Sequence, residues 1–340
     1  ASDQGNDPAA STTRKAYDLL ADGFGAGYNG PFVIVGDTGD PAARQAFTAL
    51  ATRLDTYPGV ASATVQSGTS ASVSVLTLIP STAPQSADTA RLLDRLRDTV
   101  LPAAETGTTL RVYIGGQTAV FQDFADVLTG KLPLFLTVVI LLGFILLVFA
   151  FRSLVIPLTA AVMNVLAAGA AFGVVVAIFQ WGWGSNAIGL GAPGPIESFL
   201  PVMLIAILFG LSMDYQVFLV SRIREEWLRS RDTVAAVRAG QAATGWVITA
   251  AAAIMVVVFC AFILEGRRPI GEFGLGLAAA ILLDALVLRT VLVPAVMQLF
   301  GERNWWLPGW LDRILPGAPT QHTAETDAAV VYEAVGPRVD

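Results

Sequence analysis

The sequence has little of what builds metal centres, disulfides and hydrated surfaces. It contains one histidine, His322, and one cysteine, Cys260. This excludes a multi-histidine metal site and an internal disulfide, and it leaves the redox compartment undetermined. Charged residues make up 14% of the 340 residues, against about 25% in soluble domains, and the net charge of −6 argues against a nucleic-acid-binding protein. The shortage of polar surface indicates a membrane protein.

What the sequence has instead is long apolar runs. Five segments meet the need of a bilayer-spanning helix for about 20 mostly apolar residues: approximately 132–151, 155–179, 199–221, 245–264 and 273–300. Residues 1–130 are rich in Ser, Thr and Asp, and residues 301–340 are polar again. We therefore expect an N-terminal domain over 1–130, a transmembrane domain of five helices over 131–300, and an interfacial segment with a disordered tail over 301–340.

The first 130 residues mix predicted strands and helices. Pro31–Val35 and Leu110–Ile114 are apolar runs of strand length, and Val60–Pro80 alternates as a hairpin does. Asp40–Thr56, with its first residue as N-cap, and Ala87–Thr99 carry apolar residues at helical spacing. The order β-α-β-β-α-β is that of the split βαβ, ferredoxin-like fold.

Arginine counts predict the orientation of the chain in the membrane. The connection between the third and fourth spans carries five arginines, whereas the one between the second and third has no Lys or Arg. By the positive-inside rule, the arginine-rich loop and the C-terminal tail are cytoplasmic and the N-terminal domain is extracytoplasmic. Arg267 and Arg268 in the fourth loop oppose this orientation but are outnumbered. The N-terminus carries no signal peptide, so we expect a fragment or half of a longer protein, with an upstream helix.

Ionisable residues inside the spans are few, which makes each one a candidate functional group. Asp214 lies about 22 Å into the third span, at 1.5 Å per residue, and Tyr215 follows it. Burial disfavours the charged carboxylate, so Asp214 could gain and lose a proton near neutral pH, with Tyr215 as its hydrogen-bond partner or relay. The alternative is a structural polar residue satisfied by a neighbouring helix.

The fifth span holds Asp284 and Arg289. In an α-helix residues five apart are about 140° apart, so these two are not expected to share a face. Arg289 could snorkel towards the cytoplasm or pair with Asp214. Glu197, Glu265 and Glu272 lie near helix ends and are interpreted as interfacial.

Several stretches resemble one known family. FGLSMDYQVFLVSRIREEW (Phe209–Trp227) is similar to the signature helix of the MMPL (mycobacterial membrane protein large) transporters, proton-driven exporters of the resistance-nodulation-division superfamily. The similarity covers about residues 12–316. It continues in AYDLLADGFGAGYNGP (Ala16–Pro31), FQWGWG (Phe179–Gly184), GPIESFLPVM (Gly194–Met203), TGWVITAAAAIMV (Thr244–Val256) and LLDALVLRTVLVPA (Leu282–Ala295).

The resemblance implies a fold, a function and a site. MMPL proteins have two related halves, each with one helix, an extracytoplasmic porter domain and five more helices, and this chain resembles the second half without its first helix. The resemblance assigns Asp214, Tyr215, Asp284 and Arg289 to the proton relay, which works with a similar pair from the missing N-terminal half. Many relatives have Glu where this chain has Gln216.

The resulting hypothesis is the C-terminal half of a proton-coupled plasma-membrane exporter of lipids or other hydrophobic molecules. Its partners would be the lipid substrate, the bilayer and the missing half, with no nucleic acid, and its energy source the proton gradient, with no cofactor. A lipid sensor or assembly scaffold that does not transport is the alternative, and it would be insensitive to pH. An intramembrane enzyme is disfavoured because the spans offer no His and one Cys for a catalytic or metal site.

Overall fold

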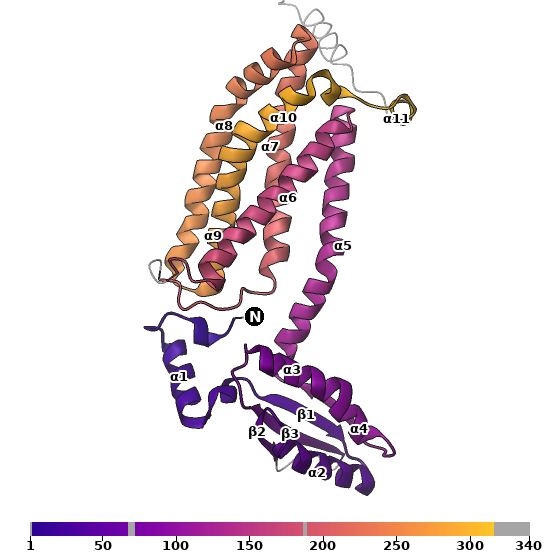
Figure 1. Ribbon diagram of the computed structural model, residues 1–340, viewed down its shortest axis with the longest axis vertical. Coiled ribbons are helices and arrows are strands. Elements are labelled where there is room, and N and C mark those ends of the chain that lie inside the picture. The colour runs from indigo at the N-terminus through magenta and orange to yellow at the C-terminus, as the bar shows by residue number, and fades with distance from the viewer. Residues whose placement is uncertain (1, 67–71, 186–188, 316–340) are drawn as a thin grey trace, which may run out of the picture.

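The computed structural model describes residues 2–66, 72–185 and 189–315. A small four-stranded domain lies at one end of a bundle of long helices, and the long helix α5 runs from one to the other (Figure 1). Within the described residues, five helical segments are long and apolar enough to cross a membrane. The chain is therefore a multi-pass membrane protein with a small antiparallel sheet.

The N-terminal domain is built on strands β1 (Phe32–Asp37), β2 (Val60–Val65), β3 (Val73–Pro80) and β4 (Arg111–Gly115). All neighbouring strands are antiparallel, in the order β2-β3-β1-β4. Helix α2 (Pro41–Asp55) follows β1, and α3 (Ala87–Arg95), the π-helix η3 (Leu96–Val100) and α4 (Leu101–Glu105) follow β3. The elements expected from the sequence are present in the expected order. The midpoint of the β2–β3 hairpin, Gly68, lies outside the described residues.

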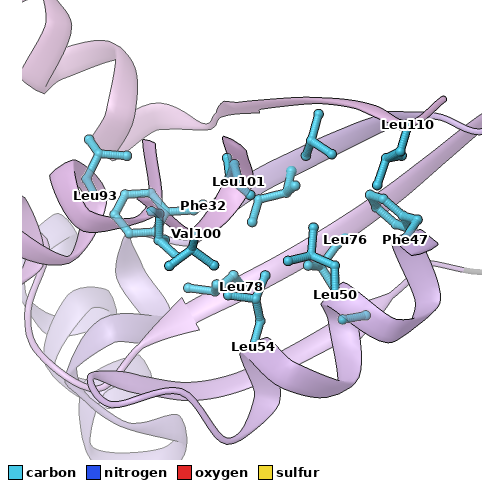
Figure 2. Packing of buried hydrophobic residues seen from close by; sticks show 14 of the residues in the cluster. Phe32, Phe47, Leu50, Leu54, Leu76, Leu78, Leu93, Val100, Leu101 and Leu110 are labelled. Atoms are coloured by element: carbon cyan, nitrogen blue, oxygen red, sulfur yellow. The ribbon is translucent and has the colours of Figure 1, made fainter. Parts of the chain in front are cut away.

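The core of this domain lies between the sheet and its helices. Phe32, Leu76 and Leu78 from the strands meet Phe47 and Leu54 from α2, and all are essentially inaccessible to solvent (Figure 2). Burial of each such side chain contributes about 1.5–3 kcal/mol. Asp40 caps α2 by accepting from the amides of Ala42 and Ala43, each at 2.9 Å. A hydrogen bond from Thr109 holds the pKa of Asp40 below its usual value.

An N-terminal region that the sequence pattern did not predict precedes this domain. It consists of a 3₁₀ turn η1 (Gln4–Asn6), helix α1 (Thr12–Phe24) and a second 3₁₀ turn η2 (Ala26–Asn29). Gly27 packs so closely on the backbone of Pro80 that a Cβ there would lie 1.8 Å from the Pro80 oxygen. The 3₁₀ turn η2 thus lies against the end of β3, directly before β1.

The bundle consists of the following elements: α5 (Gln117–Phe151), α6 (Val155–Val175) with π-helix η4 (Val176–Gln180), α7 (Leu200–Ser230), α8 (Thr233–Ala261) with 3₁₀ turn η5 (Phe262–Glu265), and α9 (Arg268–Leu283), π-helix η6 (Asp284–Leu292) and α10 (Val293–Phe300) as one continuous rod. A 3₁₀ turn η7 (Gly301–Trp305) and the short helix α11 (Gly309–Ile314) end the described chain. Residues 316–340, predicted as a disordered tail, lie outside the described residues.

The helices extend beyond the predicted apolar spans. The span predicted over 132–151 is the second half of α5, which starts at Gln117, so the predicted boundary near residue 130 falls inside a helix. Helix α7 likewise continues to Ser230, beyond the predicted span of 199–221. Helix α8 begins at Thr233, before the predicted span of 245–264. The predicted spans mark the apolar segments, whereas the helices also include their polar ends.

Candidate functional site

An ion pair between Asp284 and Arg289 lies inside the helix bundle. Arg289 Nε donates to Asp284 Oδ2 at 2.8 Å, and the two residues are 3% and 6% exposed. The expectation that these residues face different directions is wrong, because η6 is a π-helix rather than an α-helix. A π-helix closes its hydrogen bonds from i to i+5, so residues five apart stack on one face.

Polar groups from two further helices complete this cluster. Ser212 of α7 accepts a hydrogen bond from Arg289 Nη2 at 2.8 Å and donates to Oδ1 of Asn164 on α6 at 2.5 Å. Its hydroxyl also lies 3.4 Å from Asp284 Oδ1. Ser212 and Asn164 are buried, and neither was singled out from the sequence. Two features of the sequence could have indicated them. The serine lies two positions before Asp214, and the asparagine stands in an apolar helix.

Tyr215 connects α7 to the same ion pair. The guanidinium carbon of Arg289 lies 5.2 Å from the centroid of the Tyr215 ring, which is a cation–π contact. The Tyr215 hydroxyl lies 3.7 Å from the sulfur of Met255 on α8. Arg289 is thus held between a carboxylate, a hydroxyl and an aromatic ring, inside a low-dielectric bundle.

Asp214 does not join this cluster. The structure places it on the outer surface of the bundle, in line with Gly210 and Phe218, whereas Gln216 is buried. Each α-helical residue turns the side chain by about 100°, so with Ser212 facing inward Asp214 points about 200° away. The pairing of Arg289 with Asp214 is therefore not formed, and the ion pair is with Asp284 instead.

A second buried ion pair lies at the bundle end that faces the sheet domain. Arg268 and Glu272 of α9 are 1% and 0% exposed, and Arg268 Nε donates to Glu272 Oε1 at 2.9 Å. Glu272, interpreted from the sequence as interfacial, is thus buried among protein groups near the start of α9. The sequence signal was the i, i+4 spacing of opposite charges.

Arg268 and Glu272 hold the loop between η4 and α7. Arg268 donates to the carbonyls of Phe179 at 3.2 Å and Gly194 at 3.1 Å, as well as to that of Ala192. Glu272 Oε2 accepts from the amide of Glu197 at 3.1 Å. The pair satisfies backbone groups that would otherwise be buried without partners.

Among the described residues, no group of three or more His, Cys, Asp or Glu side chains could hold a metal ion. We call the group Asn164, Ser212, Tyr215, Asp284 and Arg289 the inner cluster. Two buried donors in it, Asn164 Nδ2 and Arg289 Nη1, have no hydrogen-bond partner among the described residues. These donors leave the cluster able to bind a further acceptor.

Comparison with known proteins identifies relatives that match most of the chain. The model of the MMPL family matches residues 30–323. The chain is 39% identical over 306 residues to membrane protein YdfJ of Bacillus subtilis (strain 168), covering 89% of the chain and 42% of the relative. It is 35% identical over 339 residues to the mycolic acid-containing lipids exporter MmpL11 of Mycolicibacterium smegmatis, covering 95% of the chain and 35% of the relative.

A third relative is the trehalose monomycolate exporter MmpL3 of Mycolicibacterium smegmatis, 39% identical over 227 residues, which are 67% of this chain and 22% of the relative. The chain thus spans less than half the length of these relatives. The family model covers most of the chain, including the helices that carry the inner cluster. The chain therefore belongs to the MMPL family.

Proposed function

We propose that this chain is the C-terminal half of a proton-coupled plasma-membrane exporter of lipids or other hydrophobic molecules. The observation that carries the proposal is the buried Asp284–Arg289 pair, with Ser212 and Tyr215 against it, inside a bundle of apolar helices. Ionisable groups inside membrane helices are costly and typically lie on ion or proton pathways. Two of the relatives are named as exporters, one of mycolic acid-containing lipids and one of trehalose monomycolate.

The relay needs a group that changes its charge and a helix that responds. Protonation of Asp284 removes the negative partner of Arg289 and weakens the hydrogen bond between these two η6 residues. Because Arg289 also donates to Ser212, the contact between η6 and α7 changes with it. The balance between two packings of these helices then shifts. One proton crossing 100 mV supplies about 2.3 kcal/mol, which changes a two-state equilibrium about fiftyfold.

Asp214 and Tyr215 extend the relay from the Asp284–Arg289 pair to the outer surface of the bundle. Tyr215 contacts Arg289 with its ring, and Asp214, the next residue, lies on the outer surface of the bundle. A carboxylate at this depth requires a polar partner. The partner is a similar Asp-Tyr pair on a helix of the N-terminal half, so that a proton reaches Asp214 between the two halves.

The four-stranded domain is the extracytoplasmic porter domain of the exporter. Its β1-α2-β2-β3-α3-β4 order and its sheet order, β2-β3-β1-β4, support the split βαβ, ferredoxin-like type. The bundle end remote from the sheet carries Arg222, Arg224, Arg229 and Arg231. By the positive-inside rule this end is cytoplasmic.

The test replaces one carboxyl group in the complete exporter. Asp214→Asn and Asp284→Asn, reconstituted together with the first half, are expected to lower lipid export and coupled proton uptake by about a hundredfold, as removal of a proton-transferring group does. Glu226→Gln is the matched control, because Glu226 lies on the same helix as Asp214 but at its polar end.

Unchanged export by Asp214→Asn would remove that residue from the relay. A purified chain that binds lipid equally from pH 5 to 8, with neither variant altering binding or export, would favour the sensor or scaffold function instead.

A further inference from the structure

The four-stranded sheet domain is attached to the bundle through α5 and through the N-terminal region. Helix α5 runs from the sheet domain into the bundle, and its first turns are bound to η3 by an ion pair in which Arg97 Nη2 lies 2.8 Å from Asp123 Oδ2. The N-terminal region, η1 to η2, lies between the sheet domain and the loop that precedes α7 (Figure 1). The two attachments thus involve different parts of the bundle.

Asn6 joins the N-terminal region to the bundle. Its Nδ2 donates to the carbonyl of Pro193 at 3.0 Å, and its own carbonyl accepts from the amide of Ala192 at 3.1 Å. Asn6 is 3% exposed, and a Cβ on Gly194 would lie 2.2 Å from its Nδ2. The loop therefore receives this side chain closely, and only glycine at position 194 leaves room for it.

The N-terminal region is in turn bound to the sheet domain. Asp3 accepts from Nε2 of Gln85, just before α3, at 3.0 Å, and from the Tyr17 hydroxyl of α1 at 3.1 Å. The turn η2 packs against the end of β3. Because Asp3 is the N-cap of η1, the turn that contains Asn6, a displacement of Asn6 is passed to the sheet domain through direct contacts.

Arg268 binds the loop that receives Asn6 to the helical rod that contains part of the inner cluster. Its guanidinium donates to the carbonyls of Ala192 and Gly194. Arg268 is the first residue of α9, whose 16 residues span about 24 Å at 1.5 Å per residue. The rod then continues into η6, which begins at Asp284. A movement of η6 therefore reaches the loop through a continuous helix.

We propose that Asn6 is the positioning residue through which the rod moves the sheet domain. This inference rests on the proposed function, in which protonation of Asp284 shifts the packing of η6. Helix α9 carries the shift to Arg268, and the loop passes it to Asn6. The sheet domain, held on its other side by α5, turns in response. Without the Asn6 side chain the bundle still takes up protons, but the sheet domain no longer follows.

The experiment measures the distance between two spin labels on the purified 340-residue chain by pulsed electron paramagnetic resonance. The labels are attached through Gln45→Cys in α2 and Glu265→Cys in η5, both at exposed positions, after replacement of the native Cys260 by serine. Asp284→Asn, which imitates the protonated carboxyl group, is expected to shift this distance. Asn6→Ala abolishes the shift and makes the undocked form about tenfold more populated, because a buried hydrogen bond is lost.

Two further variants separate this coupling from damage to the fold. Gly194→Ala disturbs the same contact from the side of the loop and should act as Asn6→Ala does. Asn29→Ala is the matched control. Asn29 Nδ2 donates to the carbonyl of Tyr17 at 3.0 Å, inside the N-terminal region, so the distance should still respond to Asp284→Asn.

A distance that does not respond to Asp284→Asn in the parent, or that responds equally with Asn6→Ala, overturns the proposal. In the complete exporter Asn6→Ala should lower lipid export about tenfold, in line with the rarer docked form, at unchanged proton uptake. Loss of export and proton uptake in the same proportion would show a merely structural role. The label distances do not depend on transport, so they test the Asn6 contact even where the proposed export function fails.

Discussion

Arg267 and Arg268 are adjacent in the sequence, yet the structure gives them opposite environments. Arg267 is exposed, whereas Arg268 is 1% exposed and donates to Glu272 and to the carbonyls of the η4–α7 loop. In the same region Asn6 donates to the carbonyl of Pro193 at 3.0 Å. Arg268 thus connects the start of α9 to the loop on which the N-terminal region rests.

Arg268→Gln is expected to lower the free energy of unfolding by about 3–5 kcal/mol, because it leaves the Glu272 carboxylate buried without its partner. Denaturant unfolding of the purified chain in detergent measures the effect. Arg267→Gln, the neighbouring control, should change the free energy by less than about 0.5 kcal/mol, as exposed substitutions do. Similar losses in both variants would refute the buried role of Arg268.

At the scale of elements, the π-helix η6 decides the geometry of the inner cluster. It contains Asp284 and Arg289, and Thr290 Oγ1 also donates to the carbonyl of Ala285, five residues back, at 2.7 Å. A π segment of this kind accommodates one residue more than an α-helix of the same rise. The extra residue keeps Asp284 and Arg289 on one face.

Deletion of Leu286, whose side chain is half-exposed in η6, is therefore expected to preserve folding. It brings the two charged residues to i, i+4, the spacing that pairs them in an α-helix, and keeps the orientation of α10. The melting temperature in detergent should stay within a few degrees of the parent value.

Deletion of Val257, an exposed residue in the α-helical α8, provides the comparison. It rotates the rest of that helix by about 100° and should lower the melting temperature strongly. If the two deletions are equally harmful, η6 does not carry an extra residue.

At the scale of the whole molecule, α7 presents one face to the inside of the bundle and another to its surroundings. The outer face carries Met203, Ala206, Gly210, Asp214 and Phe218, at helical spacing. A Cβ added to Gly210 would meet no atom within 4 Å. Since a carboxylate in the membrane needs a polar partner, we expect this face to be covered in the full-length exporter proposed above.

Gly210→Leu tests that expectation in two settings. In the isolated chain the added side chain enters open space, so the melting temperature should not change. In the complete exporter it should overpack an interface, at about 1–3 kcal/mol, and lower lipid export about tenfold, with Gly210→Ala less affected. Normal export by Gly210→Leu would show that no helix packs over this face.

The amino-acid pattern alone was enough to predict the membrane class, the five spans, the order of strands and helices in the N-terminal domain, and the family. These features depend on local periodicity and on runs of apolar residues, which are written directly in the chain. The candidate residues Tyr215, Asp284 and Arg289 were also identifiable, because ionisable groups stand out in apolar helices.

Which of these residues contact one another depends on the packing of the helices. The pairing of Asp284 with Arg289 depends on a π-helix. In an α-helix, residues five apart would point in different directions. The inward turn of Ser212, the outward position of Asp214 and the burial of Arg268 depend on which helix faces which neighbour. That choice is made by packing between segments far apart in the sequence, so no local pattern contains it.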